Sequence, residues 1–331
     1  MLDHSRQILQ QQSPLRGIKK YLTQTGLQLT ASKSAQRLLQ GIFYYYQKSG
    51  LQGVLRASGI LTLLRLKQLD KLITKVNRYQ PFAATYPAAG QTKARLGLFT
   101  GCTGNLFDQV TLDKTIRLLQ KLGYELVVPV RQTCCGALHQ HQGHIDSARA
   151  LALQNIQSFS GLDTIIYIAS GCGAQLHDYG SLPWPDQTSQ ALAESFADRV
   201  KEVTAFLCDE DLTALQVKPL AKRVAIHTPC SMRNGLQQAD ASKTLLAHIP
   251  QLRIESIPAE TGCCGAAGSY MISQAKLART IRQATLEAIN ELNVDLVSTT
   301  NIGCGLHLSA GLADKTYYTH PVSLLVEQIE F

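Results

Sequence analysis

The sequence predicts an α/β fold in which two repeated cysteine-rich Cys-Cys-Gly (CCG) modules follow a helical N-terminal region. Three observations predict it. All nine cysteines lie beyond residue 100, eight of them recur as two matched sets, and apolar strand patterns alternate with helical patterns between them. Such alternation is typical of layered α/β folds with mostly parallel strands.

Composition narrows the class of protein. The 331 residues suffice for two or three domains, and 45% hydrophobic with 17% charged residues suits ordinary cores. No apolar run of about 18 residues predicts a transmembrane helix. The start, MLDHSRQILQ, lacks the apolar centre of a secretory signal. We therefore expect a cytoplasmic location or the inner face of a membrane, where cysteines are more often ligands or catalysts than disulfides.

Residues 1–90 are expected to form a basic helical region and linker. Apolar residues recur at three- and four-residue spacing in LLQGIFYYYQ and in ILTLLRLKQLDKLITKV, which predicts helices. Gly50, Gly53 and Gly59 are expected to divide them into short pieces. The prolines of 79–87 predict an extended linker, because each disfavours helix in the residue before it.

Charge separates this region from the rest of the chain. Residues 1–95 hold 15 Lys and Arg and two acids, a balance of +13, whereas residues 96–331 have a balance of −5. The basic region has three open interpretations: it docks on a partner subunit, contacts a membrane surface peripherally, or is a solvated linker. Nucleic acid is not expected as a partner, since no binding motif is present.

The first CCG module is expected over 91–215 and the second over 216–331. In the first, strands are expected at 94–101, 124–130 and 163–170, and helices at 105–122 and 144–159. In the second, strands are expected at 223–229, 252–258 and 294–300, and helices at 236–248 and 270–292.

The cysteines carry the internal repeat. The first set is Cys102, Cys134, Cys135 and Cys172, and the second is Cys230, Cys263, Cys264 and Cys304. Each pair is followed by glycine, and the intervals are 32 and 37 residues in the first set and 33 and 40 in the second. Cys208 is left over, and we interpret it as a buried thiol.

Each cysteine or pair follows the end of a predicted strand. Carboxyl ends of parallel strands meet at one edge of a sheet, so each module brings four sulfurs toward one point. Four thiolates suit zinc or an iron–sulfur cluster. Zinc usually takes C-x-x-C knuckles, which are absent, whereas adjacent cysteines suit a cluster of several irons. Structural zinc, a disulfide and buried thiols remain alternatives. The neighbouring glycines are expected to let the backbone approach the ligand and donate N–H groups to it.

Four strings resemble a known family: ASGCGAQLHDYG, AIHTPCSMRNG, CCGAAGSYMIS and TNIGCGLHLSAG. They resemble the cysteine-rich domains of heterodisulfide reductases and, more closely, those of glycolate oxidase iron–sulfur subunits. The resemblance covers about 94–328. It implies that each set of four cysteines binds an iron–sulfur cluster, expected to be [4Fe-4S], in a subunit that is not catalytic alone.

The resemblance also implies partners. A flavoprotein dehydrogenase subunit, which carries the flavin, would oxidise glycolate or a similar 2-hydroxyacid and pass electrons through this chain toward a quinone or another carrier. Fuller heterodisulfide reductase modules end in C-x-x-C, whereas each module here ends in one cysteine. The resembling glycolate oxidase subunits begin with a ferredoxin-like region, whereas residues 1–90 hold no cysteine. We therefore expect that region to be absent, and another chain is a candidate to supply it.

Two alternative functions stay open: a heterodisulfide reductase-like subunit that reduces disulfides, and a non-catalytic iron–sulfur scaffold. The histidines also stay open. His139, His141 and His144 follow the first pair and are either functional or part of a solvated loop. His177 and His307 are candidates to support the cysteines indirectly, and His227 is interpreted as part of a turn.

Overall fold

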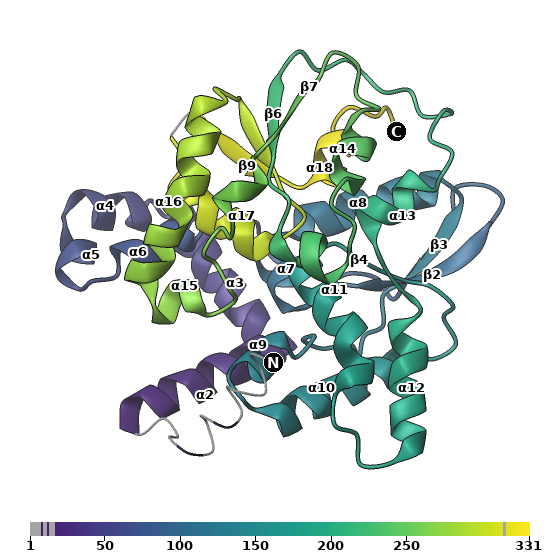
Figure 1. Cartoon of the computed structure of the whole chain (residues 1–331), viewed down its shortest axis with the longest axis horizontal. Coiled ribbons are helices and arrows are strands. Elements are labelled where there is room, and N and C mark those ends of the chain that lie inside the picture. The colour runs from purple at the N-terminus through teal and green to yellow at the C-terminus, as the bar shows by residue number, and fades with distance from the viewer. Residues whose placement is uncertain (1–7, 9–11, 13–16, 314–315) are drawn as a thin grey trace.

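The computed structural model describes residues 8, 12, 17–313 and 316–331. It contains two sheets with helices packed around them, and the N-terminal helices lie to one side (Figure 1). The predicted α/β fold is confirmed. Apart from Ile8, the stretch interpreted as lacking a secretory signal lies outside the described residues.

The first sheet has the strand order β1-β3-β2-β4-β5. Its strands are β1 Thr85–Tyr86, β2 Ala94–Phe99, β3 Tyr124–Val127, β4 Ile165–Tyr167 and β5 Val200–Glu202. Its helices are α7 Cys102–Phe107, α8 Gln109–Lys121, α9 Ala137–His141, α10 Ile145–Ser158, α11 Ser170–His177, α12 Gln187–Ala197 and α13 Val203–Cys208. All pairings are parallel except that of β1 with β3, which places an antiparallel edge strand inside the predicted linker.

The second sheet has the order β7-β6-β8-β9 and is parallel throughout. Its strands are β6 Arg223–Ile226, β7 Arg253–Ser256, β8 Leu296–Ser298 and β9 Tyr317–Thr319. Its helices are α14 Ala241–Leu246, α15 Tyr270–Ser273, α16 Ala275–Glu291, α17 Ile302–Ser309 and α18 Pro321–Val326. Four parallel strands are thus connected in the same order in both sheets, as expected of a repeat.

The two halves of the molecule share a core. One cluster of buried apolar side chains combines Leu119 and Ile166 of the first half with Val224, Leu296 and Leu325 of the second. Helix α18 makes this connection, because it packs on α8 as well as on α14. The apolar face that α8 presents is therefore covered partly by the end of the chain.

The N-terminal region is helical, as predicted. It comprises α2 Gly17–Ala31, α3 Lys33–Lys48, α4 Leu51–Ala57, α5 Ile60–Leu63 and α6 Lys67–Leu72. Gly50 and Gly59 precede α4 and α5 with φ of +78° and +75°, conformations that suit glycine. Gly53 instead lies inside α4, so only two of the three expected breaks occur.

Helix α3 attaches this region to the cysteine-rich part. The buried Gln36 accepts a hydrogen bond from the Asn105 amide at 3.1 Å, and Phe43 stacks on Phe107 with ring centroids 6.1 Å apart. Both partners belong to α7, the helix that begins at Cys102. Helix α6 contacts α17, which contains Cys304. Within the described part of the chain, no helix combines the length and apolar character needed to span a bilayer.

Candidate metal centres

The first cysteine set converges at one edge of the first sheet. Cys102 begins α7 directly after β2, the Cys134-Cys135 pair lies in the loop after β3, and Cys172 lies in the first turn of α11 after β4. The sulfurs of Cys102 and Cys134 are 3.5 Å apart. The Cys135 thiol is within hydrogen-bond reach of both Cys134 and Cys172. All four sulfurs therefore form one continuous group.

The second set repeats this order of contacts. Cys230 reaches Cys263, Cys263 reaches its neighbour Cys264, and the sulfurs of Cys264 and Cys304 are 2.9 Å apart. The backbone N–H of Gly265 donates to the Cys263 sulfur at 3.3 Å. Two groups of four sulfurs with one contact pattern are thus built from two different parts of the chain. All nine cysteines are free.

Crowding of the sulfurs shifts their pKa values in the same way in both groups. Neighbouring thiols donate to Cys134 and Cys263, which lowers the pKa of each. The pKa of Cys135 and of Cys264 is raised by contact with the neighbouring cysteines and by burial. A bound cation would replace the thiol protons and relieve this competition, because metals bind the deprotonated sulfur.

The glycine of each CCG motif has a packing role. Gly136 and Gly265 have φ of +88° and +80°. A Cβ at Gly136 would lie 3.2 Å from the Ala148 carbonyl oxygen, and one at Gly265 would lie 2.4 Å from that of Ala278. These alanines lie in α10 and α16, the helices that follow the pairs. The motif glycine thus lets a helix approach closely behind the sulfurs, rather than only making room for a ligand.

Two polar side chains that sequence reasoning missed fix the first pair. Asn155 donates from Nδ2 to the Cys134 carbonyl at 3.0 Å and accepts from the Thr133 N–H at 2.8 Å. The Tyr179 hydroxyl donates to the Cys135 carbonyl at 3.0 Å. Both side chains are fully buried. Tyr179 lies in the motif ASGCGAQLHDYG, whereas no sequence signal marks Asn155 within its helix.

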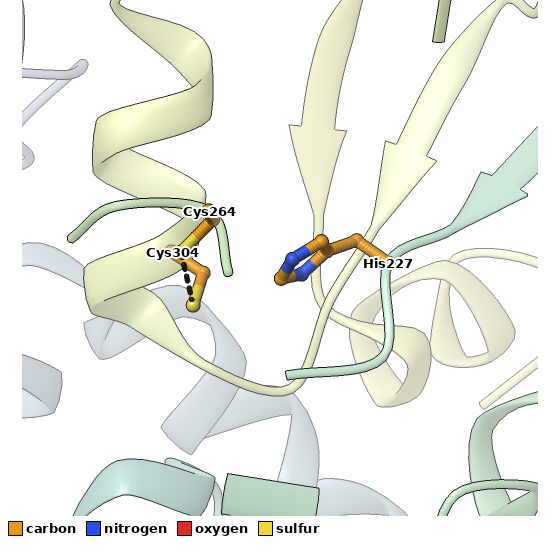
Figure 2. Close-up of side chains that lie close together, drawn as sticks. All are labelled: His227, Cys264 and Cys304. Atoms are coloured by element: carbon orange, nitrogen blue, oxygen red, sulfur yellow. Dashed lines mark hydrogen bonds between the residues drawn. The ribbon is translucent and has the colours of Figure 1, made fainter. Parts of the chain in front are cut away.

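His227 belongs to the second site. One of its ring nitrogens and the sulfurs of Cys264 and Cys304 all lie within 4.8 Å of one another, and Figure 2 shows the imidazole facing both sulfurs from the end of β6. Nδ1 lies 3.0 Å from the Thr299 hydroxyl, and burial lowers the pKa of His227 to about 4. The imidazole is therefore neutral at pH 7, as a ligand or hydrogen-bond partner of sulfur requires. The sequence had suggested only a turn at His227, and the contact with the two cysteines was not predicted.

Of the other histidines, one contacts a cysteine of the first group and another joins two helices of the second half. His139 is buried and donates toward Cys134, which helps to lower the pKa of that cysteine. His307 bonds the Ala278 carbonyl at 3.2 Å, and the guanidinium of Arg282 donates to the His307 carbonyl, so these residues fasten α17 to α16. His144 precedes α10, and burial lowers its pKa.

His177 packs edge-on against Tyr167, with ring centroids 6.2 Å apart, and burial lowers its pKa. Cys208 lies outside both sulfur groups. Its thiol donates to the Ala241 carbonyl at 3.4 Å, and burial raises its pKa to about 11. Cys208 is partly buried, not fully buried as expected, and its thiol bonds a backbone carbonyl, so it takes part in neither group.

The two sites face each other across the junction of the two halves. The Ser170 N–H, at the end of β4, donates to the Thr300 carbonyl at 3.0 Å, at the end of β8. The Ser231 hydroxyl, next to Cys230, donates to the Ser170 hydroxyl at 2.9 Å. The loops after the two pairs also touch, because Gln142 donates to Ser269 at 2.7 Å. The carboxyl edges of both sheets thus form one polar junction between the sulfur groups.

The two sites differ in exposure. In the first, Cys102, Cys134 and Cys135 are buried and Cys172 is partly buried. In the second, Cys264 and Cys304 are buried, but Cys263 is partly buried and Cys230 is exposed. The second site is therefore the more accessible one.

A comparison with known families agrees with this doubled architecture. The sequence pattern of the cysteine-rich CCG domain matches residues 96–177 and 224–309, which together cover half of the chain and all eight cysteines of the two sets. The chain belongs to the cysteine-rich CCG domain family. Each match contains one sulfur group and the strand ends that carry it.

Relatives of this CCG protein span several oxidoreductases. It is 28% identical over 341 aligned positions to the probable glycolate oxidase iron–sulfur subunit of Bacillus subtilis, with 99% of this chain and 77% of the relative covered. It is 26% identical to the glycolate oxidase iron–sulfur subunit of Escherichia coli, covering 72% of this chain and 59% of that protein. It is 30% identical to one of the subunits of the fumarate reductase (CoM/CoB) of Methanothermobacter marburgensis, covering 74% and 48%. The chain thus spans about half the length of the last two relatives.

The residues present fit an iron–sulfur cluster at each site. The donors are four cysteine sulfurs, each within reach of the next, which suit iron. Apolar side chains surround them, among them Phe99 in the first half and Leu308 in the second. A buried sulfur group with a backbone N–H donor is the environment in which proteins hold such clusters.

Proposed function

We propose that this CCG protein is an iron–sulfur electron-transfer subunit of a flavin-dependent dehydrogenase for glycolate or a similar 2-hydroxyacid. The observation that carries the proposal is the repeated order of sulfur contacts in two groups of four cysteines. Its similarity to two glycolate oxidase iron–sulfur subunits supports the choice of dehydrogenase. The flavin and the hydroxyacid site would belong to a flavoprotein partner.

Cys102, Cys134, Cys135 and Cys172 would hold one cluster, and Cys230, Cys263, Cys264 and Cys304 the other, each expected to be [4Fe-4S]. When bound, such clusters supply one-electron redox chemistry. The protein's own residues hold the sulfurs at the strand ends, donate from Gly265 N–H to the Cys263 sulfur, and keep water from the buried members. The modules are proposed to cover 91–215 and 216–331.

The junction between the halves supports transfer between the two sites. Gly171 adjoins Cys172, and a Cβ at Gly171 would lie 2.8 Å from the Asn301 side-chain nitrogen. Asn301 in turn accepts from the N–H of Gly303, the neighbour of Cys304. The two sulfur groups are therefore joined through a few contacting residues, a short path for an electron.

Chemical analysis of single-cysteine variants tests this proposal. Anaerobically purified protein is expected to contain about eight iron atoms and eight sulfides, and to show two electron paramagnetic resonance signals after reduction. Cys134→Ser should remove one signal and Cys263→Ser the other. The matched control is Cys208→Ser, which should keep both because Cys208 lies outside the groups. Protein without iron and sulfide would contradict the proposal.

A mononuclear zinc site is the second candidate for the second group, and the position of His227 favours it. Zinc accepts a mixture of cysteine and histidine ligands, and His227 lies with Cys264 and Cys304. In this case the protein would contain one zinc and about four irons, and His227→Phe would release the zinc. Two clusters and no zinc would exclude it.

Disulfide reduction is the remaining alternative, since the repeated cysteine pattern resembles that of heterodisulfide reductases. We expect the chain, supplied with electrons from a reduced viologen, to release no thiol from a heterodisulfide. Thiol release that is lost in Cys263→Ser would replace the dehydrogenase proposal by this one.

A further inference from the structure

A lobe of the N-terminal region exposes an unusual share of apolar surface. The lobe comprises α4, α5, α6 and their turns, residues 50–73, and Figure 1 shows it at one edge of the molecule, apart from both sheets. Twenty large apolar side chains are exposed among the described residues, and ten of them lie between Leu38 and Leu69. Half of these exposed side chains thus lie within a tenth of the length of the chain.

The most exposed of these side chains, Leu63, lies at a turn beside a second exposed leucine. Leu63 is 82% exposed and Leu64 58%, and they end α5 just before Arg65, whose φ is +58°. A bulky residue in this left-handed conformation is unfavourable and persists only where the surroundings hold it. The turn therefore presents two adjacent leucines to solvent, and the cations Arg65 and Lys67 follow them closely in the sequence.

A groove continues this apolar surface onto α3. It has a volume of about 970 Å³ and is lined by side chains of α3 and of the lobe. Leu38, Ile42 and Tyr45 line it on α3, and Leu66 and Leu69 line it on the lobe. All five are exposed. Leu63 and Leu64 are not among its lining residues, so the lobe carries two apolar features, the groove and the leucine turn.

The charge around this lobe is almost all of one sign. Between residues 4 and 107 the only acid is Asp70, and its carboxylate is already bound by Tyr46, Gln52 and Arg56 at 2.6–3.0 Å. Asp70 is 4% exposed and so contributes little to the outer field. The cations of the lobe and its flanks are Lys48, Arg56, Arg65, Lys67, Lys71, Lys75 and Arg78. The lobe and its flanks thus carry seven cations against one carboxylate, and that carboxylate is paired with Arg56.

We propose that this lobe docks peripherally on an anionic lipid bilayer, with Leu63 and Leu64 inserted below the headgroups. A bilayer accepts protruding leucines without a pocket of matching shape, and its phosphates would lie beside Arg65 and Lys67. A protein partner would need a concave acidic surface to fit the same turn. The exposed leucine pair beside two cations is the observation that favours lipid.

Docking in this way would place both sulfur groups near the bilayer. Helix α6 of the lobe contacts α17, which holds Cys304, and α3 contacts α7, which begins with Cys102. If the proposed electron-transfer function holds, this places a lipid-soluble acceptor within reach of the clusters. The docking itself does not depend on that function, because it rests on apolar exposure and charge alone.

Sedimentation with vesicles tests the docking. The full chain is incubated with vesicles of phosphatidylcholine alone or with about one-third phosphatidylglycerol, an anionic lipid. We expect binding to the anionic vesicles that is at least tenfold stronger and that weakens as salt is added. Leu63→Glu with Leu64→Glu should reduce binding by about tenfold or more. Arg65→Gln with Lys67→Gln should reduce binding to anionic vesicles only.

Two controls keep the result interpretable. Leu192→Glu, at an exposed position of α12 outside the lobe, should bind like the unaltered chain. In Leu63→Trp the new indole should shift to shorter wavelength on binding, whereas the emission of Trp184, the single native tryptophan, should stay unchanged. Absence of vesicle binding, equal binding to both compositions, or equal losses in the Leu192 and Leu63–Leu64 variants would overturn the proposal. Capture of the lobe by an acidic protein without vesicle binding would also overturn it.

Discussion

The glycine that follows each cysteine pair shows how one residue controls a site without touching a ligand. Gly136 and Gly265 combine positive φ with close contact to a helix carbonyl. A side chain at either position would push α10 or α16 away and move the adjacent cysteines with it. The letter G in the motif is thus required by backbone conformation and helix packing together.

A graded series of alanine substitutions separates these two causes. Gly50→Ala, with φ of +78° and no atom near a new Cβ, should lose about 1 kcal/mol in free energy of unfolding from conformation alone. Gly265→Ala should lose about 1–3 kcal/mol more, because its Cβ would meet the Ala278 oxygen. Gly136→Ala should fall between them. Urea unfolding measures all three, and equal losses would show that packing is irrelevant.

At the scale of elements, the sequence revealed the strands that carry cysteines but not the edges of the sheets. The three predicted strands of each module all occur as β2, β3 and β4 and as β6, β7 and β8. The fourth parallel strands, Val200–Glu202 and Tyr317–Thr319, read VKE and YYT and lack the buried apolar run that marks β4 and β8. The predicted helix 105–122 is divided at Asp108 into α7 and α8.

The site was predictable to a similar degree. Spacing alone grouped the eight cysteines that the fold brings together, since strand ends are legible from apolar patterns. The roles of Asn155, Tyr179 and His227 could not be predicted from the sequence, because they depend on which helix or strand end lies opposite. A buried asparagine that bonds a cysteine carbonyl looks in sequence like any polar residue of a helix.

Helix α18 depends on a neutral histidine. His320 precedes it: Nδ1 accepts from the Val322 N–H at 3.2 Å, and Nε2 faces the Ile168 carbonyl at 2.9 Å. Burial lowers the pKa of His320 to about 4. A proton on Nδ1 would remove the acceptor that caps the helix, so the fold resists protonation.

Stability should therefore fall as the pH decreases from about 6.5 to 4. In this window the unfolded chain binds a proton at His320 that the folded chain refuses, which costs up to about 3 kcal/mol. His320→Asn keeps a capping side chain without this titration. The difference in free energy of unfolding between the two proteins should narrow in acid, as measured by urea titration at several pH values. Parallel curves would contradict this role.

At the scale of the whole molecule, the two modules share one apolar core although each has its own sheet. Their largest apolar cluster crosses from one half to the other through α18, and the Thr111 and Ser323 hydroxyls meet at 2.7 Å on that contact. The sulfur groups lie on opposite sides of the polar junction between the sheets. Their relative position is thus fixed by the same packing that stabilises the fold.

Removing apolar contact at this joint should weaken both halves together. Leu325→Ala, at a fully buried position, is expected to lose about 2–5 kcal/mol in free energy of unfolding. Circular dichroism and the visible absorption of the loaded protein should still change in one coincident transition. Leu192→Ala, at an exposed position, should change stability by less than about 0.5 kcal/mol. Two separated transitions would show that the modules unfold independently.

Because α18 lies near the end of the chain, it becomes available to the fold late in synthesis. A chain made from its N-terminal side presents the first four cysteines long before residues 321–326 leave the ribosome. Until then α8 lacks the helix that covers it, so part of the apolar core of the first half is exposed to solvent. In the finished fold the sulfurs of the first site are the more deeply enclosed, whereas the second site keeps Cys230 at the surface, so a reagent in solution would reach the second site first.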